Sequence, residues 1–382
     1  MSSMKRRGNG EGSNPVQRKD GRWQILISYK DHDGISSRMT VSAKTARDVR
    51  EKAKVILGRV GQYQPPKDKK TTVGDFSQQW ITTTMEASDR KATTKQTYAS
   101  LIRSHITKST MNNVGLDKLT PSRLEKWLVE LRQSGLSSTS RRKVYNVLKL
   151  ILNSAVRDKV IAVNPLPMVE APKLDTKESK AVTEEEANKI LAALDGSRYK
   201  LPIELILATG LRRGEALGLR WPDVDFQNDL LHIRQTLARV DKTLQTDVPK
   251  TEKSDRVLKM TPRIRSILRS AKIHQTEDKL HAGSVWQDTG FVFCTEHGTP
   301  IDPRNALRAV HRATEKAGIS KVGLHSLRHG AATTALKHQV PIAEVSKMLG
   351  HSRVSTTLDI YAHAIDDASE GALLALDRAM FG

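Results

Sequence analysis

The segment from Leu324 to His363 constrains the fold of this chain more than any other stretch of its sequence. It reads LHSLRHGAATTALKHQVPIAEVSKMLGHSRVSTTLDIYAH. Pro341 suits the first turn of a helix, and Gly350 stands where a left-handed glycine ends one. Ser355 or Thr356 can cap the next short helix. The segment therefore predicts short helices joined by tight turns.

Four polar side chains occupy this segment. His325 and Arg328 are three residues apart, so they share one face of a helix. His351 follows the glycine that ends the next helix, and Tyr361 lies on the last one. A single His, Arg or Tyr on a helix is ordinarily structural. The prediction of a site therefore depends on the four residues together.

A matching segment lies upstream, from Ala208 to Asp225, and reads ATGLRRGEALGLRWPDVD. An apolar helix is expected to end there at Gly210, and a second helix to start within a few residues. Arg212 falls at this junction, near a helix N-terminus whose exposed N–H groups favour anions. Arg212 thus joins the four candidates.

The composition indicates a polyanionic partner. Lys and Arg total 63 against 42 Asp and Glu, a formal net charge of +21, while 37% of the residues are hydrophobic. The excess favours nucleic acid over membrane, because no segment pairs basic residues with an apolar insertion face. The sequence shows neither an apolar run of transmembrane length nor a signal-peptide core, so we expect a cytoplasmic protein.

Metal and cofactor chemistry have no signature in the sequence. The single cysteine, Cys294, excludes an intramolecular disulfide and a cysteine zinc cluster, and its apolar neighbours predict a buried thiol. His281 and His297 have no partners at metal-ligand spacing and are expected at the surface. Without a glycine-rich phosphate loop or a carboxylate cluster, we predict no cofactor and no metal.

Residues 1–65 predict a small β-β-β-α module that carries a basic, flexible arm over residues 1–20. Alternating apolar residues predict strands at Gly21–Tyr29 and Arg38–Ser42. Helical periodicity follows over Thr45–Val60.

Residues 72–165 predict a helical domain of four helices with an apolar core. The basic residues of its last helix, on or near the opposite face, include Arg141, Arg142 and Lys143. Any helical bundle with solvated lysines would show this pattern, so a purely structural interpretation stays open. Residues 164–180 have the composition of a linker. A third domain is therefore placed at 180–382.

The third domain is expected to combine helices with one small antiparallel sheet. Its capping box, Thr183 to Glu186, opens a helix. Strands are predicted at Leu230–Ile233, Thr243–Val248 and Arg256–Met260, and further helices at Pro262–Ser270 and Arg304–Ala317.

The segments TGLRRGE…LRWPDVD and HSLRH…LGHSRVSTTLDIYAH together resemble the tyrosine recombinase, or phage integrase, family in order and spacing. The resemblance covers the C-terminal half closely and the middle domain loosely. It implies a mainly α fold with small β-sheets (α+β). Its parts would be an arm-binding-type module at 1–65, a helical core-binding domain at 72–165 and a catalytic domain at 180–382.

The resemblance implies DNA strand transfer without metal or ATP. Tyr361 would attack phosphorus, leaving a 3′-phosphotyrosine and a free 5′-hydroxyl; its ordinary pKa of about 10 means that it needs cationic neighbours or a base. Arg212 and Arg328 would clamp the non-bridging oxygens. His325 would take the tyrosine proton, and His351 would bond a phosphate oxygen or position the site.

A lysine would protonate the leaving 5′-oxygen to give the 5′-hydroxyl. The sequence PKTEKSDR offers Lys250 and Lys253; the resemblance favours Lys250, and Lys253 stays open. Glu215 matches an acidic family position that we interpret as orienting or structural. Arg213 occupies a variable position.

The implied partners are double-stranded DNA attachment sites and a homotetramer in the synaptic complex. A host DNA-bending protein and an excisionase are candidate accessory factors. The predicted DNA contacts are Arg22, Trp23, Arg38, Arg141, Arg142 and Lys143. Ala372–Phe381 predicts a short amphipathic helix that packs either on its own domain or on a neighbouring protomer.

Two alternatives remain. A type IB topoisomerase shares the chemistry but needs neither an arm-binding module nor partner docking. A non-enzymatic sequence-specific DNA-binding protein would explain the charge, but not the coincidence of Arg212, Lys250, His325, Arg328, His351 and Tyr361.

Overall fold

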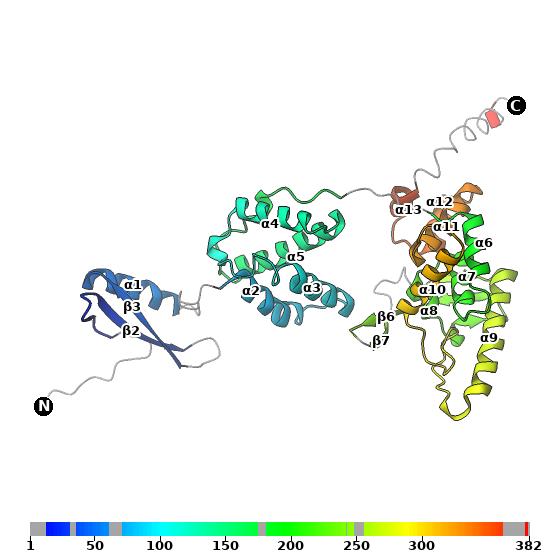
Figure 1. Cartoon of the computed structure of the whole chain (residues 1–382), viewed down its shortest axis with the longest axis horizontal. Coiled ribbons are helices and arrows are strands. Elements are labelled where there is room, and N and C mark those ends of the chain that lie inside the picture. The colour runs from blue at the N-terminus through cyan, green and yellow to red at the C-terminus, as the bar shows by residue number, and fades with distance from the viewer. Residues whose placement is uncertain are drawn as a thin grey trace. The chain divides into compact units, whose positions relative to one another are not determined.

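The structure, a computed structural model, describes residues 13–30, 36–60, 71–174, 181–241, 243–247, 256–361 and 379–380. The chain divides into two compact units. The first is Met1–Asp89 with Tyr98–Leu174, and the second is Arg90–Thr97 with Asp175–Gly382. Figure 1 labels many of their helices and strands.

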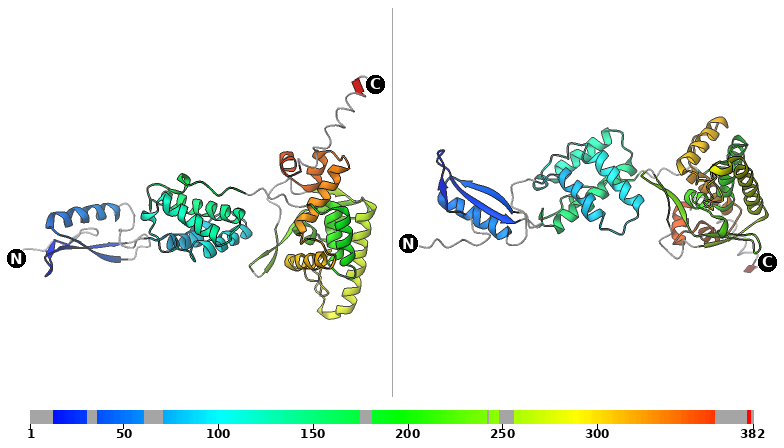
Figure 2. Two further views of the ribbon diagram at one scale, coloured as in Figure 1. Left: turned by 45° about the horizontal axis from the view of Figure 1, so that its top comes forward. Right: turned by 90° about the horizontal axis from the view of Figure 1, so that it is seen from below.

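The N-terminal part of the first unit is an antiparallel sheet of β1 (Val16–Gln17), β2 (Trp23–Lys30) and β3 (Ser36–Ala43), followed by α1 (Ala46–Val60). Alternation along β2 buries Ile25 and Ile27, which pack with residues of α1. Figure 2 shows α1 along one face of the sheet. The predicted β-β-β-α order is confirmed. The prediction of a flexible arm over residues 1–20 is wrong at β1, because β1 pairs with β2. Residues 1–12 of the predicted arm lie outside the described residues.

The rest of the first unit contains α2 (Val73–Trp80), the part of α3 (Ala92–His105) from Tyr98 onward, α4 (Pro121–Gln133) and α5 (Ser138–Arg157). A π-helical turn, Ile81–Met85, continues α2. Thr72, Thr120 and Ser137 cap three of the helices with their side chains. The buried apolar side chains include Ile102, Trp127 and Leu148. The four predicted helices are confirmed.

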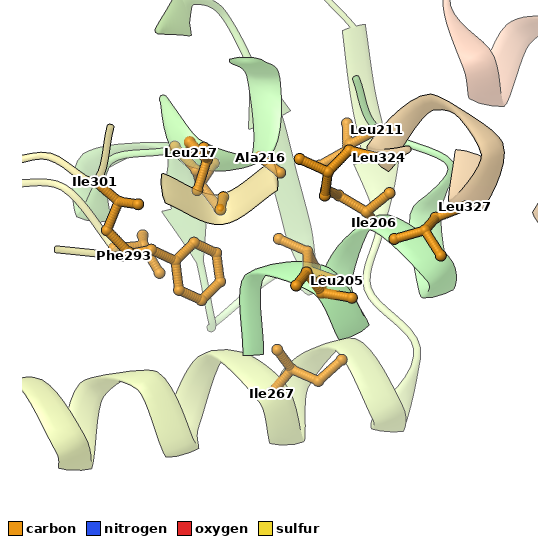
Figure 3. Packing of buried hydrophobic residues seen from close by; sticks show 14 of the residues in the cluster. Leu205, Ile206, Leu211, Ala216, Leu217, Ile267, Phe293, Ile301, Leu324 and Leu327 are labelled. Atoms are coloured by element: carbon orange, nitrogen blue, oxygen red, sulfur yellow. The ribbon is translucent and has the colours of Figure 1, made fainter. Parts of the chain in front are cut away.

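The helices of the second unit that surround the candidate site pack on two apolar clusters, a large one and a smaller one formed by the last three of these helices. They are α6 (Glu184–Ala193), α7 (Lys200–Thr209), α8 (Arg213–Leu217), α9 (Pro262–Ala282), α10 (Pro303–Lys316), α11 (Leu324–Lys337), α12 (Ile342–Leu349) and α13 (Val354–Tyr361). Figure 3 shows Ile267 of α9 pointing toward Leu205 of α7. The predicted capping box at Thr183 is present, whereas α9 runs on past the predicted end at Ser270.

Two separate β-structures replace the one predicted sheet. β4 (Val224–Asp225), β5 (Leu230–Ile233) and β8 (Arg256–Lys259) form a three-stranded sheet. β7 (Thr243–Asp247) instead pairs with β6 (Thr236–Val240), a strand that the sequence pattern did not predict. The pairing of Val240 with Thr243 leaves a two-residue turn, in which Asp241 has φ 53°. A short hairpin closes at small entropic cost, so it forms in place of the more distant pairing.

The helix ends of the C-terminal segment agree with the prediction in part. Gly350 is left-handed, with φ 68°, and ends α12 as expected. Pro341 is the N-cap residue of α12, one position before its first turn. Ser355 and Thr356 do not cap α13, because that helix already begins at Val354. The predicted helix Ala372–Phe381 lies outside the described residues except for 379–380.

Candidate active site

The junction of α7 and α8 presents Arg212. Gly210, with φ 66°, ends α7, and Arg212 is the N-cap residue of α8. Glu215, in the first turn of α8, accepts hydrogen bonds from the Arg212 backbone N–H (2.9 Å) and from its guanidinium (2.8 Å). One buried carboxylate therefore fixes both the backbone and the side chain of Arg212, which stays 45% exposed.

Arg328, on α11, ties two helix ends together. It is 2% exposed, and its guanidinium donates to the carbonyl oxygens of Gly210 (2.6 Å) and Leu349 (2.9 Å). Carbonyls at a helix C-terminus lack intrahelical partners, so these bonds satisfy groups that would otherwise be orphaned. Burial lowers the pKa of Arg328 to about 10, with the nearby Arg212 adding to the effect, yet the side chain stays charged at neutral pH.

His351 lies directly after Gly350 and contacts Arg328. Its Nε2 is 3.0 Å from an Arg328 nitrogen, and its Nδ1 is 2.8 Å from the Thr357 hydroxyl. A guanidinium only donates, so Nε2 accepts and the ring proton is assigned to Nδ1, which donates to Thr357. Burial first, and then the charges of Arg328 and Arg212, lower the pKa of His351 to about 4. His351 is therefore neutral.

Tyr361, the last residue of α13, is 2% exposed. It packs in a small apolar cluster with Ala332, Leu336, Val345 and Leu349. Burial raises the pKa of the phenol to about 12, although Arg328 acts in the opposite direction. In this state the hydroxyl stays protonated at neutral pH.

Two histidines of α11, His325 and His329, form a series with Tyr361 in which each ring contacts the next. The His329 ring centroid is 5.3 Å from that of Tyr361 and 4.3 Å from that of His325. His329 is buried, whereas His325 is exposed. Partial desolvation of its ring first, and then the charges of Arg328 and Arg212, lower the pKa of His325. His325 is thus kept neutral and able to accept a proton.

The structure brings five of the six predicted catalytic residues into one region. Arg212 and Arg328 bond adjacent carbonyls of the α12 end, since Arg212 also donates to the Gly350 oxygen at 3.1 Å. Lys250 and Lys253 lie outside the described residues.

Three further residues of this region were not among the predicted ones: Arg256, His329 and Thr357. The strand pattern gives no signal for Arg256, because a charged residue at the start of a strand is usually exposed. It is 8% exposed and binds Glu215 at 2.9 Å. His329 had a signal, since it directly follows the HSLR sequence.

The charge of the region is strongly positive. The guanidiniums of Arg212 and Arg256 act to lower the pKa of Arg328, and the Glu215 carboxylate acts against them. Burial acts to raise the pKa of Glu215, but its bonds to Arg256 and Arg212 outweigh burial and lower it. One carboxylate thus faces three guanidiniums among these described residues. The surplus of cations suits a phosphodiester anion.

The predicted DNA contacts outside this region differ in their surroundings. Arg22, Arg38 and Lys143 are exposed. Trp23 packs partly against the core of the N-terminal sheet. Arg142 donates to the Pro172 carbonyl at 2.9 Å, and Arg141 is partly buried.

The chain is similar to known protein families and to known proteins. The Phage integrase family matches residues 180–367, and the Phage integrase SAM-like domain matches residues 75–174. A "Tyrosine recombinase XerC-like" protein of Caldanaerobacter subterraneus subsp. tengcongensis is 30% identical over 91% of this chain and 93% of its own length. The chain belongs to the phage integrase family. An integrase of Streptomyces ambofaciens is 27% identical over 98% of this chain and 97% of its own length.

Solved structures share the fold. The Tn1549 transposon integrase, in complex with a circular intermediate DNA, superposes with a TM-score of 0.66 at 21% identity, over 80% of this chain and 99% of that one. A lambda integrase dimer bound to a core site gives 0.58 at 18% identity, over 94% and 97%. The mainly helical fold with small antiparallel sheets is confirmed.

The family assignment makes this protein an enzyme, a tyrosine recombinase of site-specific DNA recombination. It favours this interpretation over a topoisomerase or a repressor. Among the described residues, no group of three His, Cys, Asp or Glu is arranged to hold a metal ion. Cys294 is buried, as predicted, and no described helix is both long and apolar enough to cross a bilayer.

Proposed function

We propose that this recombinase cuts one strand of a double-stranded DNA attachment site with Tyr361 and rejoins it to a partner strand. The cut would leave a 3′-phosphotyrosyl link, and the 5′-hydroxyl of a partner duplex would release it, integrating or excising a phage or other mobile element. The observation that carries the proposal is the junction of α7, α11 and α12. There, Arg212, Arg328 and His351 meet around capped helix ends with surplus positive charge.

The arginines are the groups that would stabilise the transition state. Arg212 is half exposed, so a scissile phosphate can reach its guanidinium. Arg328 is fixed by two carbonyls and by His351, so its charge is preorganised. Preorganised donors stabilise developing charge without reorganisation during the reaction. His351 accepts from Arg328 here, which favours its positioning role over a direct bond to phosphate.

Tyr361 would be activated only after a rearrangement. Its hydroxyl is buried and its pKa is about 12, so a bound DNA must expose the phenol before attack. His325, neutral and exposed, is the candidate acceptor of the phenolic proton. Lys250 would donate a proton to the leaving 5′-oxygen, which becomes the free 5′-hydroxyl, with Lys253 as its alternative.

Around this site we divide the chain into the three domains 1–65, 72–165 and 180–382. The exposed Arg22, Arg38 and Lys143, together with Trp23, Arg141 and Arg142, would contact DNA. A homotetramer would assemble two duplexes in the bacterial cytoplasm, with a DNA-bending protein and an excisionase as accessory factors. A lambda integrase tetramer has been solved on a Holliday junction, which supports the tetramer.

The test is covalent trapping on a nicked duplex that spans the junction between the mobile element and its host chromosome. The reaction contains EDTA and no ATP. Wild type should form a denaturation-resistant adduct and Tyr361→Phe none, whereas Tyr199→Phe, in the same domain, should react normally. Specific binding without an adduct would favour a repressor. An adduct with Tyr361→Phe would exclude this nucleophile.

A further inference from the structure

We propose that Arg256 is a positioning residue of the strand-cleavage reaction, because it joins the segment that presents Arg212 to the segment that presents His351. The inference rests on the proposed function of the site. Arg256 is the first described residue after 248–255 and opens β8, yet it faces inward and is buried.

The first contact of Arg256 is with the carboxylate that holds Arg212. Its two terminal nitrogens lie 2.9 and 3.3 Å from the two oxygens of Glu215. Because this fork neutralises Glu215, the carboxylate does not cancel the positive charge of Arg212. That charge can then attract an incoming anion. Without Arg256, Arg212 would be the partner left to balance the carboxylate, and its half-exposed guanidinium would stabilise less of the negative charge that develops on the phosphate in the transition state.

The second contact is with the end of α12. Arg256 Nε donates to the Met348 carbonyl at 3.1 Å. The guanidinium also lies against Gly350, where an added Cβ would come within 2.7 Å of its Nη1. Arg256 therefore supports the turn that directly precedes His351.

The three guanidiniums form one arrangement. Arg256, Arg328 and Arg212 bind the successive carbonyls of Met348, Leu349 and Gly350. Each arginine comes from a different segment of the chain, so the α12 end becomes the common support on which their relative positions are set. A displacement of about 1 Å in a catalytic group can lower a rate about a hundredfold.

Arg265 provides a matched control within the same unit. Its Nε donates to Asp229 at 2.8 Å and its terminal nitrogen to the Phe226 carbonyl at 2.6 Å. Like Arg256, it binds one carboxylate and one backbone carbonyl. None of these contacts involves a candidate catalytic residue. Both arginines should contribute to stability, and only Arg256 should affect the chemical step.

The experiment measures the rate of adduct formation, in single turnover and per folded protein, on the same nicked junction duplex, together with duplex affinity. In the full-length chain, Arg256→Met should lower the rate about a hundredfold with nearly unchanged affinity. Arg256→Lys retains the charge but not the fork, so it should recover about tenfold of that loss. Arg265→Met should react at the wild-type rate.

A double substitution tests whether Glu215 and Arg256 act as a unit. Glu215→Gln combined with Arg256→Met should be no slower than the slower single variant. The proposal is overturned if Arg256→Met or Arg256→Lys, well below its Tm, reacts as fast as Arg265→Met, or if the loss lies in affinity alone. If neither wild type nor Arg265→Met forms a Tyr361-dependent adduct, the proposed function itself fails, and the role of Arg256 fails with it.

Discussion

The buried core of the helical region 71–174 and that of the region 181–361 differ in whether they contain charged side chains. Among the described residues of the helical region, the buried polar side chains are neutral hydroxyls: Ser77, Ser138 and Ser154. The other region buries Glu204, Glu215, Asp223, Arg256, Arg328 and His329. Burying a charge is unfavourable unless it is paired and hydrogen-bonded. The difference therefore separates a core built for packing from one that also carries a reaction site.

The partners of the buried groups show how each core meets its polar requirements. In the helical region, Trp80 Nε1 donates to the Ser154 hydroxyl at 2.9 Å, and the Tyr145 hydroxyl donates to the Leu166 carbonyl at 3.1 Å. In the other region, buried guanidiniums donate to helix-end carbonyls and to Glu215. Buried ionisable groups with shifted pKa values gather at functional sites, which is the pattern here.

The largest expected effect follows from breaking the charged core at Arg328. Arg328→Met leaves the Gly210 and Leu349 carbonyls without their donor, and an unsatisfied buried group costs about 1–3 kcal/mol. We expect a loss of about 3 kcal/mol in the free energy of unfolding. Adduct formation should fall at least about a hundredfold, since a preorganised cation is removed.

The matched change in the neutral core is Leu148→Met, which should cost less than about 1.5 kcal/mol and leave the rate of adduct formation unchanged. Hydrogen exchange resolved along the full chain measures both losses by region. Equal losses for the two variants would show that the Arg328 bonds add nothing beyond packing.

Acidification should destabilise the two regions unequally, and the difference should be smaller than the effect of Arg328→Met. The pKa of His351 is about 4 in the folded state, against about 6.5 when unfolded. Between these values the unfolded chain binds the extra proton, so stability is full above pH 6.5 and falls as the pH drops toward 4. From pH 7 to 5 we expect a loss of about 1.5 kcal/mol, allowing for partial solvent screening, in the region 181–361.

The helical region should change little over the same range, because its described core buries no Asp, Glu, His, Lys or Arg side chain. His351→Gln should flatten the pH dependence, since an amide can accept from Arg328 and donate to Thr357 without titrating. His338→Gln, at an exposed histidine, is the control and should leave the dependence intact. Hydrogen exchange at both pH values gives the answer, and an equal loss in both regions would contradict it.

Local signals explain what the sequence could predict. The capping box at Thr183 and the left-handed Gly350 depend on neighbours within a few residues, and both are confirmed. The grouping of Arg212, His325, Arg328, His351 and Tyr361 came from family motifs rather than from periodicity. The sequence therefore predicts secondary structure correctly where the residues that cause it are close to one another along the chain.

The errors and omissions have distant causes. Arg256 binds Glu215 across 41 positions and Met348 across 92, so no local pattern reveals its burial. β7 was assigned to the wrong sheet because β6, its real partner, carries no strong alternation. The burial of Tyr361 depends on packing against α11 and α12, which a motif does not encode.

The smallest effect is expected from removing the buried hydrogen bond between Trp80 and Ser154 in the helical region. Ser154→Ala removes the acceptor of Trp80 Nε1, and both residues are buried, so we expect a loss of about 1 kcal/mol. Thr107→Ala, whose exposed hydroxyl bonds the Arg103 carbonyl, should cost no more than about 0.5 kcal/mol. Urea unfolding of the full chain measures both, and adduct formation should match wild type in each. If Ser154→Ala slowed cleavage more than it weakened the fold, the helical core would take part in the reaction, and the contrast between the two cores would not hold.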